Sequence, residues 1–176
     1  AHPFLDGNGR LGRLLITLML INDGVLHSCL FYPSFQFKKN RSEYYRQLTS
    51  VRERGTYEEW IEFFCNSLLE SAKDSVGSLK NLVDLHNRFT ATITENLGRT
   101  AANGQRLLGI LEEHPIVDTA FIAAQLDIGR STASSLVKSF EELGILRPLD
   151  ESRQRYRQYG YEEYLSILRE DAEPIR

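Results

Sequence analysis

The side chains that could do chemistry gather within the first thirteen residues of the chain. They are His2, Asp6, Gly7, Asn8, Gly9, Arg10 and Arg13. Two flexible glycines around an amide let several backbone N–H groups point at one anion. The apolar run that follows predicts a helix, and a helix N-terminus adds unpaired N–H groups and a partial positive charge. The loop therefore predicts a phosphate site.

The charged side chains of this loop suit the same ligand. Arg10 and Arg13 are three residues apart, so on a helix they share one face and both can reach a phosphate. Asp6 can hold a hard cation such as Mg²⁺ beside it, although a carboxylate at this place could also cap the helix. His2 is a candidate general base, because a histidine exchanges protons near neutral pH.

The elements that position the loop are predicted to be helical. The segment from Asn8 or Gly9 to Ile21 is apolar around its whole circumference, which indicates a central, buried helix. A second helix is expected over about 37–54. A third follows a capping box at Thr56, with a weak point at 75–78, and continues to about residue 97.

The pattern changes after residue 98. Residues 98–104 are predicted to form a linker, and the elements beyond it are short. Helices are expected near 107–113 and over 119–126, 131–143 and 161–168, with strands over 145–149 and 155–159. Three short helices followed by a hairpin are typical of a winged helix-turn-helix. We therefore expect two domains, residues 1–98 and residues 99–176.

Gly7 to Gly12 also matches the G-x-G-x-x-G pattern of dinucleotide-binding proteins. That pattern requires a preceding strand and a βαβ unit. Here a His-Pro-Phe segment precedes the glycines and helices follow them, so a Rossmann fold is excluded.

Composition narrows the class of protein. The net charge of −3 gives no global attraction to nucleic acid or to anionic membranes, and no run reaches the ~20 apolar residues that span a bilayer. The two cysteines, Cys29 and Cys65, suit a reducing compartment, so we expect no membrane partner and a cytoplasmic location. Because the chain starts without Met just before the reactive loop, we expect it to be the C-terminal part of a longer protein.

The whole loop resembles the signature of the Fic (filamentation induced by cAMP) family. The matching positions are His2, Pro3, Phe4, Asp6, Gly7, Asn8, Gly9, Arg10 and Arg13. Downstream segments at 32–34, 39–45 and 60–64 are similar to the family's pattern, so the resemblance covers about residues 1–95. It implies that residues 1–98 form part of the Fic helical bundle, so together with the winged helix-turn-helix and small β-hairpin that the later elements predict, we expect a mainly α protein. It also implies a Mg²⁺-dependent adenylyltransferase that moves AMP from ATP onto a Ser, Thr or Tyr hydroxyl of a target protein.

The resemblance assigns a role to each position of the loop. His2 would deprotonate the target hydroxyl, and Asp6 would hold Mg²⁺ between the α- and β-phosphates. The anion hole would be formed by Gly7, Asn8 and Gly9. Arg10 would bind the β-phosphate and Arg13 the γ-phosphate. Phe4 would anchor the loop in the core.

The resemblance also implies parts that these 176 residues do not contain. The family has helices before the loop, a β-hairpin flap that aligns the target, and an inhibitory helix with a [ST]-x-x-x-E-[GN] pattern. Residues 91–96 have Ala91 where that pattern needs Ser or Thr. We therefore expect the isolated segment to be inactive or nearly so.

The C-terminal domain leaves two interpretations open. Its candidate nucleic-acid contacts are Arg130, Lys138, Arg153, Arg155 and Arg157. Residues 99–176 nevertheless hold 10 Lys and Arg against 13 Asp and Glu, a net charge of −3, whereas DNA-binding domains are usually basic. The domain could instead dock a target protein or form a homodimer. The alternative to an enzyme is a DNA-binding transcriptional regulator whose Fic-like lobe senses nucleotide.

Overall fold

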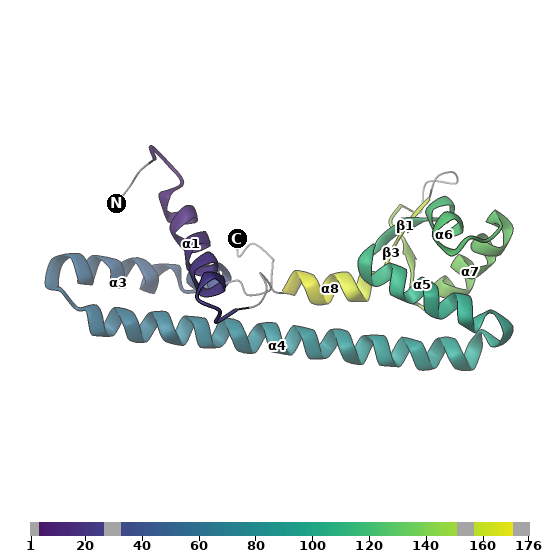
Figure 1. Cartoon of the computed structure of the whole chain (residues 1–176), viewed down its shortest axis with the longest axis horizontal. Coiled ribbons are helices and arrows are strands. Elements are labelled where there is room, and N and C mark those ends of the chain that lie inside the picture. Colours follow the sequence, from purple (N-terminus) through teal and green to yellow (C-terminus); the bar gives the residue numbers. More distant parts are fainter. Residues whose placement is uncertain (1–3, 27–32, 151–156, 171–176) are drawn as a thin grey trace. The chain divides into compact units, whose positions relative to one another are not determined.

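The computed structural model describes residues 4–26, 33–150 and 157–170, and these residues are mainly helical with one small antiparallel sheet (Figure 1). The predicted fold class, mainly α, is therefore confirmed. Residues up to Gly77 form one compact unit, and Ser78–Glu170 form a second. The identities predicted for the domains 1–98 and 99–176 remain predictions.

Four helices build the first unit: α1 (Asn8–Asn22), α2 (Pro33–Lys39), α3 (Arg41–Arg54) and the beginning of α4 (Tyr57–Asn96). The prediction of a single helix over 37–54 is wrong, because the helix is interrupted at Asn40 and two separate helices, α2 and α3, form instead. There the Asn40 side-chain amide donates to the Gln36 carbonyl oxygen at 3.2 Å and ends α2. At the weak point predicted over 75–78 the chain stays helical, since α4 continues through it.

Aromatic rings hold α2, α3 and α4 of this unit together. Phe37 is 3% exposed, and its ring lies 5.3 Å from that of Tyr44 and 5.8 Å from that of Phe64. Trp60 completes the cluster with its ring 5.7 Å from that of Tyr44. Such ring pairs add to the burial of their apolar area, so this cluster fixes the three helices against one another.

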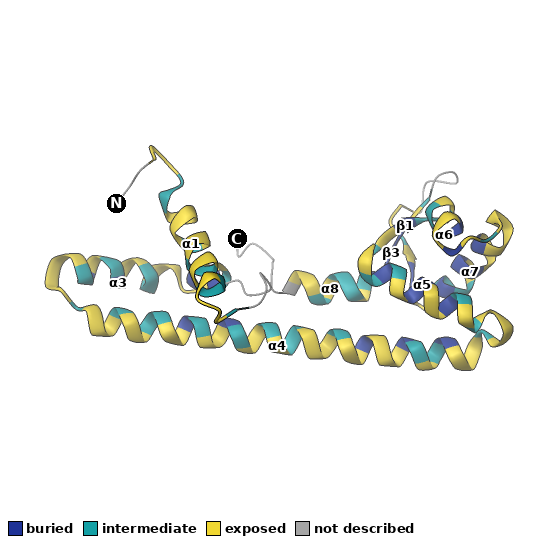
Figure 2. Ribbon diagram, in the orientation of Figure 1, coloured by how far each residue is buried: buried dark blue, intermediate teal, exposed yellow. Residues whose placement is uncertain are grey.

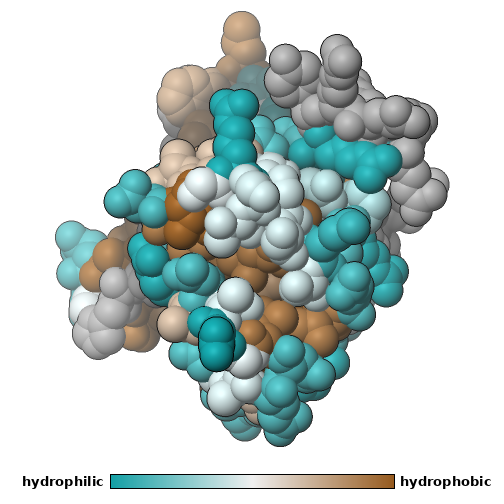
Figure 3. Space-filling model, turned by 90° about the vertical axis from the view of Figure 1, so that its right-hand side faces the viewer, coloured by the Kyte–Doolittle hydropathy of each residue, from teal (hydrophilic) through white to brown (hydrophobic). Residues whose placement is uncertain are grey.

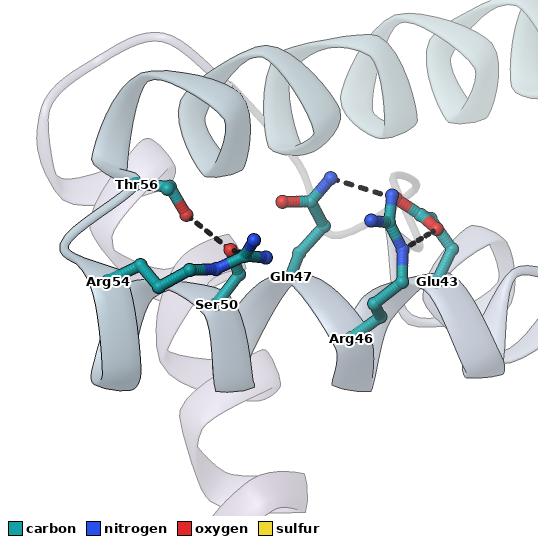
Figure 4. A network of polar contacts seen from close by, with 6 residues as sticks. All are labelled: Glu43, Arg46, Gln47, Ser50, Arg54 and Thr56. Atoms are coloured by element: carbon teal, nitrogen blue, oxygen red, sulfur yellow. Dashed lines mark hydrogen bonds and ion pairs between the residues drawn. The ribbon is translucent and has the colours of Figure 1, made fainter.

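Polar contacts reinforce α3 and the turn into α4 (Figure 4). Glu43 accepts hydrogen bonds from Arg46 at 2.6 and 2.8 Å and from Gln47 at 2.8 Å. The Arg46 hydrogen bond, followed by that of Gln47, lowers the pKa of the Glu43 carboxyl below its usual range. The Ser50 and Thr56 hydroxyl groups are 2.6 Å apart across the turn, which fixes where α4 begins.

The buried position predicted for α1 is wrong. None of its residues is buried, and its ribbon is coloured exposed or intermediate in Figure 2. The exposed apolar side chains include Leu14, which is 55% exposed, and Leu18, which is 50% exposed, four residues apart on one face. Among the described residues of the first unit, α1 packs mainly on α2, which is too short to surround it. An apolar circumference indicates that burial would stabilise a helix, but it does not show that other elements are present to bury it.

The second unit contains the latter part of α4, the 3-10 turn η1 (Gly98–Thr100) and α5 (Ala101–Glu113). It continues with β1 (Ile116–Asp118), α6 (Thr119–Leu126) and α7 (Arg130–Glu142), and ends with β2 (Arg147–Pro148), β3 (Gln158–Gly160) and α8 (Glu162–Glu170). The strands have the order β1-β3-β2 and are antiparallel, with Val117 opposite Tyr159 and Pro148 opposite Tyr159. The predicted order of short helices and hairpin strands is observed. β1 was not predicted.

The core of the second unit extends into α4. Its fully buried members include Ile93 from α4, Leu107 and Leu111 from α5, and Phe140 from α7. The apolar side chains that pack only partly on this core are Leu97, Ala101, Ile110, Phe121, Ile128, Leu143, Tyr164 and Ile167. The predicted linker at 98–104 is therefore wrong, since this segment is a 3-10 turn and the start of a packed helix. On one face of the molecule, shown in Figure 3, apolar surface appears between hydrophilic side chains.

Candidate anion-binding loop

The loop that the sequence singles out leads directly into α1, as predicted. Gly7 precedes the helix with φ of 80°, a left-handed conformation that glycine adopts without strain. The Gly7 carbonyl oxygen accepts from the Leu11 N–H at 3.0 Å and starts the helical ladder. His2 lies outside the described residues, so its place relative to the loop stays a prediction.

No side chain among the described residues caps the N-terminus of α1. The Asp6 carboxylate, for which a capping role was open, bonds to the Arg10 guanidinium at 3.5 Å instead. The N–H groups of the first turn therefore keep their capacity to bind an anion, and the partial positive charge of the helix end is not neutralised by a cap.

Both arginines fold back over the glycines. A Cβ added to Gly7 would lie 3.6 Å from Arg10 Nη2, and one added to Gly9 would lie 3.4 Å from Arg13 Nη1. A Cβ at either glycine would be in ordinary van der Waals contact with the guanidinium group, so each group lies close beside its glycine. The structure thus brings Gly7, Gly9, Arg10 and Arg13 together as a cationic cradle.

Asn8 makes a contact that the sequence did not reveal. Its Oδ1 accepts from the Phe4 N–H at 3.1 Å, and its Nδ2 donates to the Phe4 carbonyl oxygen at 2.6 Å. The side chain therefore ties the first turn of α1 to the main chain four residues earlier. An amide four residues after a Phe, with a glycine between them, is the only sequence signal, and it is too common to predict this pair.

The anchoring role expected for Phe4 is wrong in this structure. Phe4 is 58% exposed and Leu5 is fully exposed. The physical reason is the one that leaves α1 uncovered, since the described part of the first unit places no other element over the loop.

Asp6 is the only carboxylate in the described part of this loop, residues 4–13, that could hold a metal. The described residues contain no group of three or more His, Cys, Asp or Glu side chains that could hold a metal ion. The Asp6 side chain is 95% exposed and the Arg10 side chain 77%, so their ion pair is weak and solvent-screened. Mg²⁺ is commonly held by one or two carboxylates together with substrate phosphates and water, and a single accessible Asp fits that mode.

The second unit presents a polar face on α7 that carries two cations. Arg130 and Lys138 are exposed, as are the hydroxyl-bearing residues Ser131, Thr132, Ser134 and Ser135. The opposite face is apolar and buried in the core. Arg153 and Arg155 lie outside the described residues. Arg157 is half-buried and lies directly before β3. The basic hairpin therefore remains a prediction.

No helix in the described ranges is long and apolar enough to cross a membrane. Among the families of known proteins, no family model matches the chain.

The curated proteins that are similar to part of the chain include two protein adenylyltransferases. The protein adenylyltransferase fic-1 of Caenorhabditis elegans is 31% identical over 83 residues, which are 47% of this chain and 15% of that protein. Protein adenylyltransferase fic-1 of Caenorhabditis briggsae is 32% identical over 79 residues, 45% of this chain and 14% of that protein. This chain spans about one seventh of the length of these relatives. The similarity is partial, and it indicates a Fic-like segment within the chain.

Proposed function

We propose that the loop of residues 2–13 is the nucleotide-binding and catalytic loop of a protein adenylyltransferase. The observation that carries the proposal is the cradle, in which two guanidinium groups fold over two glycines at an uncapped helix N-terminus. Such a site suits the phosphates of ATP better than an uncharged ligand. The partial similarity to two protein adenylyltransferases supports the same reaction class.

In the proposed reaction, the hydroxyl oxygen of a Ser, Thr or Tyr side chain on the target protein attacks the α-phosphorus of ATP. A new P–O bond forms, the bond to the oxygen bridging the α- and β-phosphates breaks, and pyrophosphate leaves. His2 takes the proton of the attacking hydroxyl. Arg10 and Arg13 neutralise the β- and γ-phosphates, and the N–H groups at the start of α1 bind the phosphate oxygens.

Asp6 would hold Mg²⁺ beside the phosphates, and the bound ion would neutralise charge on the leaving pyrophosphate. For this, Asp6 must exchange its weak bond to Arg10 for the metal. The same exchange frees the Arg10 guanidinium for a phosphate.

Transfer of label from α-labelled ATP, with Mg²⁺, in the full-length protein tests this function. We expect label on the protein itself or on proteins of the cell it comes from, and loss of the label in His2→Ala and Arg13→Ala. Arg52→Ala, at an exposed arginine in the last turn of α3, is the matched control and should transfer normally. Absence of transfer from the wild-type protein under all conditions would refute the proposal.

We also propose that the second unit is a winged-helix module that binds a partner through α7. The exposed Arg130 and Lys138 and the hydroxyl groups between them could contact the phosphates of duplex DNA. A target protein or a second copy of the chain is the competing partner. A shift of duplex DNA that weakens with salt and is lost in Lys138→Glu, but not in Lys39→Glu on α2, would favour DNA. DNA binding that Lys138→Glu leaves unchanged would exclude α7 as the binding surface.

A further inference from the structure

We propose that Asn8 is a positioning residue, whose side chain closes the loop of residues 4–8 through the Phe4 main chain and does not itself contact the phosphates. This inference rests on the proposed function. It concerns how the cradle keeps its shape, and it changes the role that the family resemblance gives to Asn8.

The contacts of Asn8 carry the inference. Both ends of its amide group are engaged by one residue, with the Phe4 N–H donating to Oδ1 at 3.1 Å and Nδ2 donating to the Phe4 carbonyl oxygen at 2.6 Å. This reciprocal pair needs an acceptor and a donor on one short side chain. Asparagine supplies both, whereas aspartate supplies only acceptors and the aliphatic residues supply neither.

The position of the pair within the loop explains its purpose. Leu5, Asp6 and Gly7 lie between its two anchor points, so the pair limits how far the Asp6 carboxylate and the left-handed Gly7 can move. Gly7 in turn sets the first helical hydrogen bond, from Leu11. Fixing both ends of the loop before a ligand arrives lowers the entropic cost of binding.

The competing interpretation is that the Asn8 side chain binds a phosphate directly. Nδ2 carries a second hydrogen that could reach a phosphate oxygen directly. If Asn8 positions the loop, removing its side chain should have little effect once Gly7→Ala has already distorted the loop. If Asn8 binds a phosphate, removing it should weaken binding in either background. A double-mutant cycle with Gly7→Ala therefore distinguishes the two roles. The cycle works because an alanine at φ of 80° is strained.

The experiment uses the full-length protein and has two arms. The first measures the exchange of the Phe4 amide proton by NMR without nucleotide, in the wild type, in Asn8→Ala and in Asn8→Asp. We expect exchange about tenfold faster in Asn8→Ala, because the amide loses its acceptor. Exchange should be less affected in Asn8→Asp, which keeps that acceptor. Asn22→Ala, at the exposed asparagine that ends α1 and whose side chain donates to the neighbouring Asp23 at 3.2 Å, is the control and should leave Phe4 unchanged.

The second arm measures kcat and KM for ATP in AMP transfer by Asn8→Ala, Gly7→Ala and the double variant. A positioning role predicts that Asn8→Ala lowers kcat at least tenfold alone and has little further effect in the Gly7→Ala background. Unchanged Phe4 exchange, together with a raised KM for ATP that adds fully to the Gly7→Ala effect, would overturn the proposal. If the wild-type protein transfers no AMP, the proposed function fails, and the exchange arm still decides whether Asn8 holds the loop.

Discussion

Gly104 in α5 lies directly against Ile93 in α4, where a Cβ on the glycine would stand only 2.8 Å from Ile93 Cγ2. Ile93 is completely buried and cannot move aside without disturbing the core of the second unit. We therefore predict that Gly104→Ala lowers the free energy of unfolding by about 1–3 kcal/mol, as overpacking of a dense core does. Urea unfolding followed by far-ultraviolet circular dichroism measures this.

Gly109 in the same helix is the matched control. A Cβ there would meet nothing within 4 Å, and the residue is exposed. Gly109→Ala should therefore raise the free energy of unfolding by about 0.5–1 kcal/mol, because alanine loses less backbone entropy in a helix. If Gly104→Ala behaved like Gly109→Ala, the close approach of α5 to α4 would be disproved.

The same glycine shows why part of the fold could not be predicted. Glycines at 98 and 104 suggested a linker, and Gly98 does turn the chain with φ of 46°. Gly104 instead permits a close helix contact. A sequence does not distinguish the two uses, because both require only the lack of a side chain.

Hydrophobic periodicity predicted the bounds of a helix well where the residues at its two ends mark its start and its stop. The bounds of α6 matched the prediction, since Asp118 caps it and Asp127 ends it. Strand β1 was missed because three residues are too few to show alternation, and its pairing with β3 depends on residues some forty positions away. At the loop, residue types predicted an anion site, whereas the hydrogen bonds of Asn8 depend on a backbone geometry that residue types do not encode.

Asp118 offers a second stability test. Its Oδ1 accepts from the Phe121 N–H at 2.8 Å and caps α6. Asp118→Ala should lower the free energy of unfolding by about 1 kcal/mol, whereas Asp118→Asn, which keeps the acceptor, should cost less. Equal losses from the two variants, measured by urea unfolding, would show that the carboxylate acts through its charge instead of as a cap.

Alkaline pH should weaken the second unit through its tyrosines. Burial raises the pKa of the Tyr161 hydroxyl, and the nearby Glu112 carboxylate raises it further. Burial, then Glu112, also raises the pKa of Tyr164. Below about pH 10 the folded and unfolded states both keep these protons, so stability is unaffected. Above it the unfolded state releases them first, and the free energy of unfolding falls as pH rises.

Tyr161→Phe isolates that contribution. The Tyr161 hydroxyl is buried without a hydrogen-bond partner among the described residues, so removing it should not destabilise the unit at neutral pH. The urea midpoint of Tyr161→Phe should then decline less between pH 9 and pH 11, about one unit on either side of the usual tyrosine pKa. A decline as steep as that of the wild type would assign the alkaline loss to other groups.

Gly7 and Gly12 provide the sharpest test of the loop, because both belong to the Gly-Asn-Gly-Arg-x-Gly run and only one has a conformational need for glycine. Gly7 has φ of 80° and its α-carbon faces the Arg10 guanidinium, whereas a Cβ on helical Gly12 would meet nothing within 4 Å. An alanine at Gly7 costs about 1–2 kcal/mol of strain, and we expect the loop to relieve it by changing the direction of its N–H groups. We predict that Gly7→Ala lowers AMP transfer by the full-length protein at least tenfold, while Gly12→Ala keeps the transfer and stabilises α1. Isothermal titration with ATP and Mg²⁺ should show the same order of affinities. Equal losses in the two variants would mean that the glycines serve packing against another element, and that the left-handed turn is not what shapes the anion site.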